Sequence, residues 1–236
     1  MLLDRTRLTE PLRRAAAESE ILVNPDGAAL DAARALRTCA YAMPRTPAEA
    51  EVERFFDRFD GAPNTLILAI RRHGAMIGSL RMSVCDAVPG TVPEGDGPVA
   101  WLCGDGLGRE PLSGRIVDHS RFSIDRTALD AAGAHLLLFA AAYVAARGLG
   151  GTVAAGAVFP HHTRFWESMF GFRRDGAPRH AGLLPMPLQL VQRSYGDIAA
   201  QGFDEAALIG DLRGRWRASF GDGAGPDDLR DLSGTV

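Results

Sequence analysis

The order of extended and helical segments in the middle of the chain is the feature that most restricts its fold. Residues 65–71 read Thr-Leu-Ile-Leu-Ala-Ile-Arg, and residues 75–84 follow after a His-Gly turn, which predicts a β-hairpin. Next come a third predicted strand over residues 116–124, a long apolar helix over residues 127–147 and a buried strand over residues 152–159. Strands that alternate with helices in this way predict an α/β fold, in which helices cover a mixed sheet.

The segments on either side of this centre complete the domain. The remaining predicted elements are helices over residues 24–43 and 46–59, a short helix from Pro160 to Gly171, and strands over residues 172–175 and 186–193. Asn24 suits the N-cap of the first helix, and Pro25 suits its first turn. We expect residues 1–23 to form an Arg-rich helical lead, residues 24–193 one α/β domain, and residues 194–236 a helical extension with a flexible tail.

The charged residues and cysteines exclude several classes of function. The sequence contains no lysine, so all 26 basic residues are arginines, which excludes a lysine Schiff base and a lysine-dependent phosphate loop. A net charge of −3 provides no basic field for wrapping nucleic acid, so no nucleic-acid partner is expected. The three cysteines are odd in number and lie far apart without a C-x-x-C spacing, which predicts neither a zinc site nor a disulfide framework. No third ligand is evident beside the pair His161-His162, so no metal is expected.

The apolar segments favour a cytoplasmic protein. The first ten residues include Asp4, Arg5, Arg7 and Glu10, which is unlike a signal peptide. The longest apolar stretch, residues 131–146, contains a histidine and is too short for a membrane span. We therefore expect no integral membrane segment.

Two predicted strands carry charge where a covered sheet should be apolar. Alternation places Gly78, Leu80, Met82 and Val84 on one face of their strand and Ile77, Ser79, Arg81 and Ser83 on the other. In the next strand it places Ile116, Asp118, Ser120, Phe122 and Ile124 on one face and His119, Arg121 and Ser123 on the other. Buried charges cost free energy unless they are paired or face a wet cavity. The strands therefore predict either a solvated face with structural ion pairs or a polar cleft for a charged substrate, and the two can coincide.

Two other polar groups have a plain interpretation. Asp57 and Asp60 lie in the segment Phe56-Asp-Arg-Phe-Asp60, and composition alone indicates a surface at a helix end. His161 and His162 open a predicted helix, where such a pair is more often a surface feature than a set of ligands.

Taken together, these residues resemble a known family. The ordered motifs Phe56-Asp-Arg-Phe-Asp60, Asn64-Thr65, Gly78-Ser-Leu-Arg81 and Asp118-His-Ser-Arg-Phe122 are similar to the acyl-carrier-protein-dependent branch of the GNAT acyltransferases. That branch contains the LuxI-type acyl-homoserine lactone synthases and the FeeM-like N-acyl amino acid synthases. The segment Phe165-Trp-Glu-Ser-Met-Phe-Gly-Phe172 resembles the N-acyl amino acid synthases most closely. The resemblance covers about residues 28–193 and implies a three-layer GNAT fold.

The resemblance also implies which residues form the site. In the family, an arginine of the early helix, paired acids, a strand arginine, and an acid and arginine before a phenylalanine shape the cleft where the amine meets the acyl thioester. It implies Asp118 and Arg121 as catalytic residues and Arg37, Asp57, Asp60, Arg81, Ser120 and Phe122 as substrate-binding residues. The family usually has glutamate where this chain has Asp118, so we expect Asp118 to act as a base either directly or through a bridging water.

A missing loop bears on the acyl donor. GNAT enzymes that use coenzyme A carry Arg/Gln-x-x-Gly-x-Gly/Ala, whose glycines let backbone N–H groups approach the pyrophosphate. The matching residues 126–131 have Leu129 in place of the first glycine. We therefore expect no tightly bound cofactor and an acyl-phosphopantetheine donor on acyl-carrier protein. Candidates for docking this acidic partner are Arg164, Arg173, Arg174 and Arg179, which otherwise are scattered solubilising residues.

The expected function is transfer of a fatty acyl group from acyl-carrier protein to the amine of an amino acid, giving an N-acyl amino acid or an autoinducer-type quorum-sensing signal. Candidates for lining the acyl tunnel, or for ordinary core packing, are Val153, Val158, Phe159, Phe165 and residues 136–139. No tryptophan lies near Ala42-Met43, where many lactone synthases carry one, which counts against a lactone product. Two alternatives stay open: a coenzyme A-dependent N-acetyltransferase for small molecules, and a non-catalytic GNAT-like module that binds an acyl ligand.

Overall fold

The computed structural model describes residues 12, 14–41, 47–49, 58–88, 93–104, 114–125, 133–180 and 184–200. The strands in this part of the chain are β1 (Ser19–Val23), β2 (Thr65–Arg72), β3 (Ala75–Ala87), β4 (Gly114–Ile124), β5 (Val153–Val158), β6 (Arg173–Arg179) and β7 (Leu188–Ser194). The helices are α2 (Gly27–Tyr41), α4 (Pro98–Gly104), α6 (Ala134–Gly148), α7 (Thr163–Phe170) and α8 (Tyr195–Ala200), with 3₁₀ turns η1 (Arg58–Gly61) and η3 (Pro160–His162).

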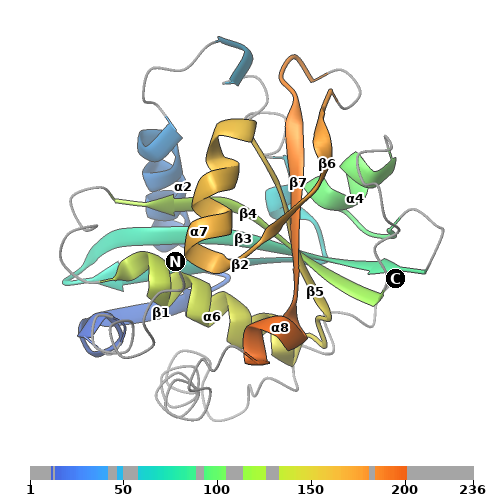
Figure 1. Cartoon of the computed structure of the whole chain (residues 1–236). Helices are drawn as coiled ribbons and strands as arrows, with labels where there is room; N and C mark the ends of the chain where they lie inside the picture. Colours follow the sequence, from blue (N-terminus) through green and yellow to red (C-terminus); the bar gives the residue numbers. More distant parts are fainter. Residues whose placement is uncertain are drawn as a thin grey trace.

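The strands form one mixed sheet in the order β1-β2-β3-β4-β5-β7-β6 (Figure 1). Neighbouring strands are antiparallel except β4 and β5, which are parallel and are connected through α6, as a parallel pair requires a crossover. β4 and β5 pair only from Ile116–Val153 to Asp118–Ala155, although both strands continue beyond these residues. The sheet therefore splits between its two central strands.

One face of the sheet carries the larger apolar core. α6 is buried on almost every side, as expected for a helix with so few polar residues. α7 and α8 pack beside it, and the Phe139 and Phe170 rings stack with centroids 4.1 Å apart. Leu80 and Met82 of β3 point into the same core, which confirms the predicted apolar face of that strand.

The opposite face is more polar. α2 lies against β3 and β4, and its Arg37 side chain reaches Ser79 of β3. A smaller apolar cluster forms where α4 covers the far ends of the strands, with Val99 and Leu102 packed against Ile116 and Leu190. The helices on the two faces make three layers, which is the predicted architecture (Figure 1).

The structure confirms most of the predicted elements and corrects four details. Residues 19–23, expected to be helical, form edge strand β1, which pairs with β2 through alternating buried side chains. Asn24 does not cap a helix: its Oδ1 accepts the Ile67 N–H at 2.9 Å, and α2 begins at Gly27. The Gly- and Pro-rich segment 86–115 contains α4, which was not predicted. Strand β6 runs to Arg179, beyond its predicted end.

Two predicted segments lie largely or wholly outside the described residues. Of the helix expected over residues 46–59, the structure describes residues 47–49 as helical, and the following η1 turn includes Phe59. The stretch that matches the coenzyme A loop, residues 126–131, lies outside the described part of the chain.

Candidate active site

A β-bulge in β4 sets the directions of the side chains around the split. Ser79 pairs with Ser123 and Arg81 with Ser120, so one residue of β3 faces two residues of β4. Arg121 takes up the extra length with φ of 57°, a left-handed conformation that is uncommon for a residue other than glycine. The predicted strict alternation is therefore wrong beyond Ser120: Phe122 and Ile124 pack into the large core instead of sharing the face of Asp118.

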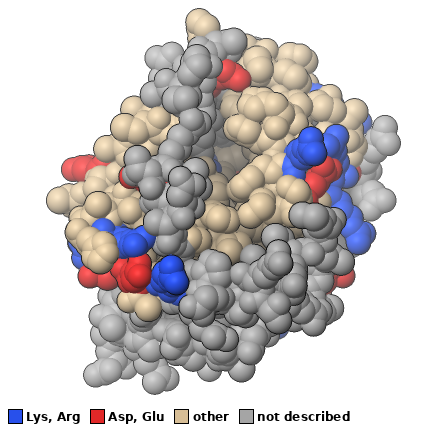
Figure 2. Space-filling view, turned by 60° about the vertical axis from the view of Figure 1, so that its left-hand side comes forward, with Lys and Arg blue, Asp and Glu red and all other residues tan. Residues whose placement is uncertain are grey.

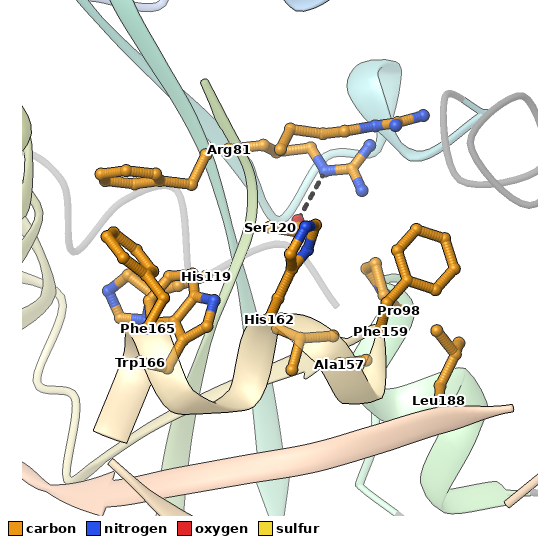
Figure 3. A pocket seen from close by; sticks show the side chains of 13 residues that line it. Arg81, Pro98, His119, Ser120, Ala157, Phe159, His162, Phe165, Trp166 and Leu188 are labelled. Carbon is orange, nitrogen blue, oxygen red and sulfur yellow. Dashed lines mark hydrogen bonds between the residues drawn. The ribbon is translucent and has the colours of Figure 1, made fainter. Parts of the chain in front are cut away.

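A cavity of about 370 Å³ lies beside this bulge, where β4 and β5 separate (Figure 3). This volume is typical of a small-molecule site. Its walls come from β3, the start of α4, β4, the end of β5, η3, α7 and β7. The lining residues are Arg81, Pro98, His119, Ser120, Arg121, Phe122, Ala157, Val158, Phe159, His162, Phe165, Trp166 and Leu188.

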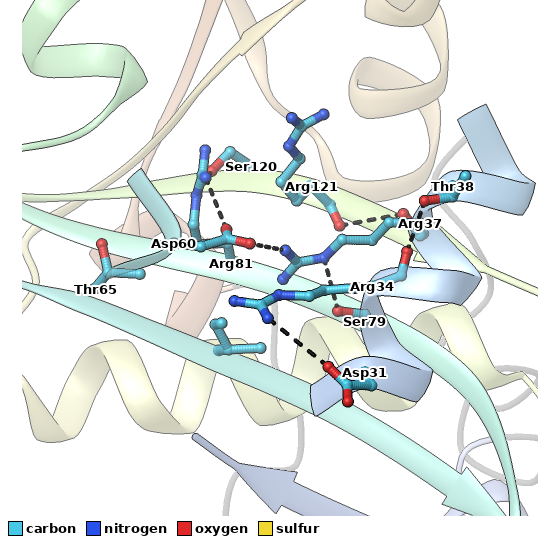
Figure 4. Close-up of polar contacts among 12 residues, drawn as sticks. Asp31, Arg34, Arg37, Thr38, Asp60, Thr65, Ser79, Arg81, Ser120 and Arg121 are labelled. Carbon is cyan, nitrogen blue, oxygen red and sulfur yellow. Dashed lines mark hydrogen bonds and ion pairs between the residues drawn. The ribbon is translucent and has the colours of Figure 1, made fainter. Parts of the chain in front are cut away.

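Arg81 connects the cavity to a hydrogen-bonded network behind it (Figure 4). Its Nε donates to Ser120 Oγ at 3.1 Å, and its Nη1 donates to Asp60 Oδ1 at 3.0 Å. Arg37 donates to the other oxygen of Asp60 at 2.8 Å and, through Nε, to Ser79 at 3.2 Å. One carboxylate thus bridges two buried guanidinium groups, and this bridge fixes the direction in which Arg81 meets Ser120.

Asp118 lies just behind the cavity wall, fully buried beneath the start of α4. Gly97 allows α4 to start this close to the sheet, because a Cβ there would lie only 2.9 Å from the Ser83 Cβ beside Asp118. Burial raises the pKa of Asp118 to about 7, although the charge of Arg81, the Val99 N–H and the Ser120 hydroxyl act in the opposite direction. Among described residues, neither carboxylate oxygen has a partner with full hydrogen-bond geometry. Ser120, two residues along the same strand, reaches the cavity where Asp118 does not.

The wall opposite this network is aromatic. The Phe122 ring lies 5.9 Å from the Phe165 ring and 5.7 Å from the Trp166 ring, measured between centroids. Phe165 is 37% exposed, whereas Trp166 is buried. In space-filling form, the molecule has a hollow whose right-hand border is formed mainly by uncharged residues (Figure 2). One side of the cavity is therefore suited to hydrocarbon and the other to a charged group.

Two histidines line the cavity. His119 is buried among Phe139, Phe172 and Tyr195, and its Nε2 lies 3.3 Å from the Tyr195 hydroxyl. Burial lowers the pKa of His119 to about 4, so the ring is neutral near pH 7. His162 is half-buried and enters from the α7 side, whereas its neighbour His161 is exposed. The sequence did not predict that His162 borders a cavity.

The structure brings together part of the predicted site. Arg81, Ser120, Arg121 and Phe122 line the cavity, whereas Arg37 and Asp60 lie behind Arg81. Asp57 lies outside the described residues. The roles of all these side chains stay predictions.

The candidates for the acyl tunnel divide between cavity and core. Val158, Phe159 and Phe165 line the cavity. Val153 packs in the smaller cluster and residues 136–139 pack in the larger one. Sequence reasoning missed His119, Trp166 and Leu188, because their places depend on where β4 and β5 separate.

The four arginines considered for docking are all exposed on α7 and β6. Arg174 pairs with Glu167, with an N–O distance of 2.7 Å, so part of its charge is already neutralised. Arg164 and Glu167 are separated by one helical turn. In the described part of the chain, no cluster of three or more His, Cys, Asp or Glu side chains is placed to hold a metal ion, and no helix is long and apolar enough to cross a membrane.

Comparison with known proteins identifies the fold and the family. The sequence profile described as "N-acyl amino acid synthase FeeM" matches residues 32–194. The structure of FeeM, an N-acyl amino acid synthase from uncultured soil microbes, is 18% identical with a TM-score of 0.54, covering 78% of this chain and 95% of that one. A putative N-acetyltransferase from Lactobacillus plantarum is 16% identical with a TM-score of 0.48, covering 75% and 99% of the two chains. No curated protein matches. The sheet and its helices are the GNAT fold, and the chain belongs to the FeeM family of N-acyl amino acid synthases, which are acyltransferases.

Proposed function

We propose that this acyltransferase moves a long-chain acyl group from the phosphopantetheine arm of acyl-carrier protein to the α-amine of an amino acid. The observation that carries the proposal is a single cavity with one aromatic wall and one cationic wall. The aromatic wall of Phe122, Phe165 and Trp166 suits the acyl chain. The wall that contains Arg81 and Arg121 suits the acceptor carboxylate, because a guanidinium fork matches a carboxylate.

The split between β4 and β5 suits the arm of the donor. Pantetheine is an extended chain with two amide groups, and such a chain can pair with backbone groups at a strand edge. β4 and β5 stop pairing after Asp118–Ala155, so their backbones face one another across the split without hydrogen bonds between them. The substitution of Leu129 for glycine in the coenzyme A loop favours a donor tethered to acyl-carrier protein over free coenzyme A.

The chemistry requires a base near the amine. Asp118, with its pKa near 7, is ionised in a large share of molecules at neutral pH and can still accept a proton. Because Asp118 does not reach the cavity, the proton passes through Ser120 or a water beside it. The amine nitrogen then attacks the thioester carbon, the C–N bond forms and the C–S bond breaks. In this proposal, backbone N–H groups at the strand split stabilise the oxyanion.

A basic surface beside the cavity completes the proposal. Arg164, Arg173, Arg174 and Arg179 lie on the exposed side of α7 and β6. An acidic carrier protein docked there would place its arm close to Phe165 at the start of α7. Complementary charge of this kind raises the association rate more than it raises the affinity.

The test is acyl transfer by the purified full chain. Dodecanoyl-acyl-carrier protein or dodecanoyl-coenzyme A is supplied with a mixture of the twenty amino acids, and products are identified by mass spectrometry. We expect N-dodecanoyl amino acids from the carrier-protein donor at a much higher rate. Faster transfer from coenzyme A would favour a coenzyme A-dependent enzyme, and the absence of any N-acyl product from either donor would overturn the proposal.

A further inference from the structure

His162 extends into the cavity from the wall opposite Ser120, and the transfer described above gives it no role (Figure 3). Local structure holds the residue in place. The backbone N–H of His162 donates to the Phe159 carbonyl at 2.8 Å. The Thr163 hydroxyl closes the same turn by donating to the Pro160 carbonyl at 2.8 Å. The imidazole lies edge-on to the Phe159 ring at 6.0 Å and to the His161 ring at 4.2 Å. The ring is therefore oriented by its neighbours.

The other titratable groups on the cavity wall are poor proton donors. Arg81 and Arg121 keep their protons at any ordinary pH. His119 is neutral, and its Nε2 faces the Tyr195 hydroxyl in the core. Asp118 lies behind the β4 wall, beside the position proposed for the amine. His162, on the β5 and α7 side, adds an imidazole to the cavity wall, and imidazole is the side chain that most often transfers protons in catalysis.

The leaving group creates a need for such a donor. When the C–S bond breaks, its electron pair stays on the sulfur. Alkyl thiols are weak acids, so an alkyl thiolate leaves more slowly than an acidic aryl thiolate, and a proton donated to the sulfur speeds its departure. The amine nitrogen, which loses a proton, and the sulfur, which gains one, are different substituents of the same carbon. A base on the β4 wall that takes the proton from the amine is therefore not also beside the sulfur. A second proton carrier on the facing wall would meet this need.

We propose that His162 is a catalytic residue that protonates the pantetheine sulfur as it leaves. The proposal rests on the function proposed above. An imidazolium N–H gives its proton to the sulfur while the C–S bond breaks, and the thiol departs. The acceptor ammonium loses two protons in forming the amide. One of them reaches the imidazole through solvent and replaces the proton that was given to the sulfur. The other is released to solvent.

The test compares two donors with different leaving groups on the same enzyme preparation. Dodecanoyl-pantetheine releases an alkyl thiol that needs a proton, whereas S-(4-nitrophenyl) dodecanethioate releases an acidic aryl thiol that leaves as the anion. With His162→Gln we expect kcat/KM for the pantetheine donor to fall about 100-fold, which is the lower range for a general acid. The same variant should use the aryl donor almost as well as the unaltered protein. His180→Gln, which changes an exposed histidine outside the cavity, is the matched control and should leave both rates unchanged.

Because both donors are measured on one preparation, a loss of folded protein cancels in the ratio of their rates, and His162→Asn provides a second variant. An equal loss with both donors would show a structural role or a role at the amine, and would overturn the proposal. An equally selective effect in His180→Gln would do the same. If the unaltered protein transfers no acyl group from either donor or from acyl-carrier protein, the proposed function fails, and that result is distinct from an equal loss in the variant.

Discussion

The two faces of β3 and β4 are both covered by helices, yet they carry opposite chemistry. On one face, Leu80 and Met82 pack against α6 in an apolar core. On the other, Arg81 and Asp118 are fully buried, and Arg81 belongs to a polar network. Buried charge seldom improves stability over a well-packed apolar group. The difference indicates that the polar face is retained for a purpose other than folding, and it points to the cavity that this face borders.

The polar face itself contains two kinds of buried charge. Arg81 has strong partners, because Asp60 and Ser120 accept hydrogen bonds from its guanidinium group. Asp118 lacks comparable partners, and desolvation by burial raises its pKa. A well-paired charge serves to position, whereas a poorly paired carboxylate is ready to take up a proton. The substitutions below separate these two kinds.

Asp118→Asn should have the largest effect, and it should act on activity and stability in opposite directions. Loss of the base should lower kcat by about 1,000-fold. The pKa of Asp118 is higher in the folded chain than in the unfolded chain, so its contribution to stability is present at low pH and is lost as pH rises through about 7. At pH 8 the variant should therefore be more stable than the unaltered protein, by on the order of 4 kcal/mol.

The measurement for this variant is urea unfolding at pH 5 and at pH 8, together with a pH–rate profile. The stability difference should shrink toward pH 5, and kcat/KM of the unaltered enzyme should rise through about pH 7. A variant that is less stable at pH 8 would show that Asp118 has strong partners, and it would remove the contrast with Arg81.

Asp60→Asn should mainly destabilise the fold. Its carboxylate bridges Arg37 and Arg81, and these guanidinium groups are almost completely buried. Removing the charge should lower the free energy of unfolding by about 3 kcal/mol, as for other buried pairs that lose one partner. Asp31→Asn is the control, because Asp31 and Arg34 form an exposed pair at 3.9 Å and the change should stay within about 0.5 kcal/mol. If urea unfolding shows the same loss of stability for Asp60→Asn and Asp31→Asn, the bridge is no stronger than an exposed ion pair and does not position Arg81.

Much of the fold could be predicted because its strands and helices have clear periods. The β2–β3 hairpin and the apolar helix α6 are long and regular, so their patterns survive in the sequence. α4 is short and lies between Gly- and Pro-rich segments, and the apolar run after Pro98 was its main signal. The bulge at Arg121 had no signal at all, because the positive φ is not marked by glycine or asparagine.

The candidate site was only partly accessible to sequence reasoning for a related physical reason. Arg81 and Asp118 attracted attention because charges in covered strands are unusual. His162 looked like a surface residue, since nothing local shows that β4 and β5 separate in front of it. Residues placed by local pattern could be found, whereas residues placed by the split depended on tertiary structure.

Phe165→Ala tests the apolar side of the comparison. Phe165 lines the cavity and is 37% exposed, so part of its ring is available to cover an acyl chain. Loss of about 1 kcal/mol of apolar contact should lower kcat/KM for a dodecanoyl donor about fivefold. Transfer of a butanoyl group should change little, because a short chain does not reach the ring. Val88→Ala, at a 66% exposed site away from the cavity, should affect neither donor. Equal losses for both chain lengths would show that Phe165 supports the fold and not the chain.

Arg173→Glu should have the smallest effect, and one that depends on salt. Arg173 is exposed at the start of β6, so its charge acts on an approaching partner through solvent. With dodecanoyl-acyl-carrier protein, kcat/KM should fall about threefold at low salt and recover at high salt, because exposed charges are screened. Arg174→Gln should lower kcat/KM less, since Glu167 already neutralises Arg174. Arg147→Glu on α6 is the control, because it makes the same charge change away from α7 and β6. Dodecanoyl-pantetheine, which has no protein surface to dock, should react at unchanged rates with all three variants. If Arg173→Glu slows dodecanoyl-pantetheine by the same factor, Arg173 acts at the acyl site. The result would then give no support for docking of acyl-carrier protein on α7 and β6.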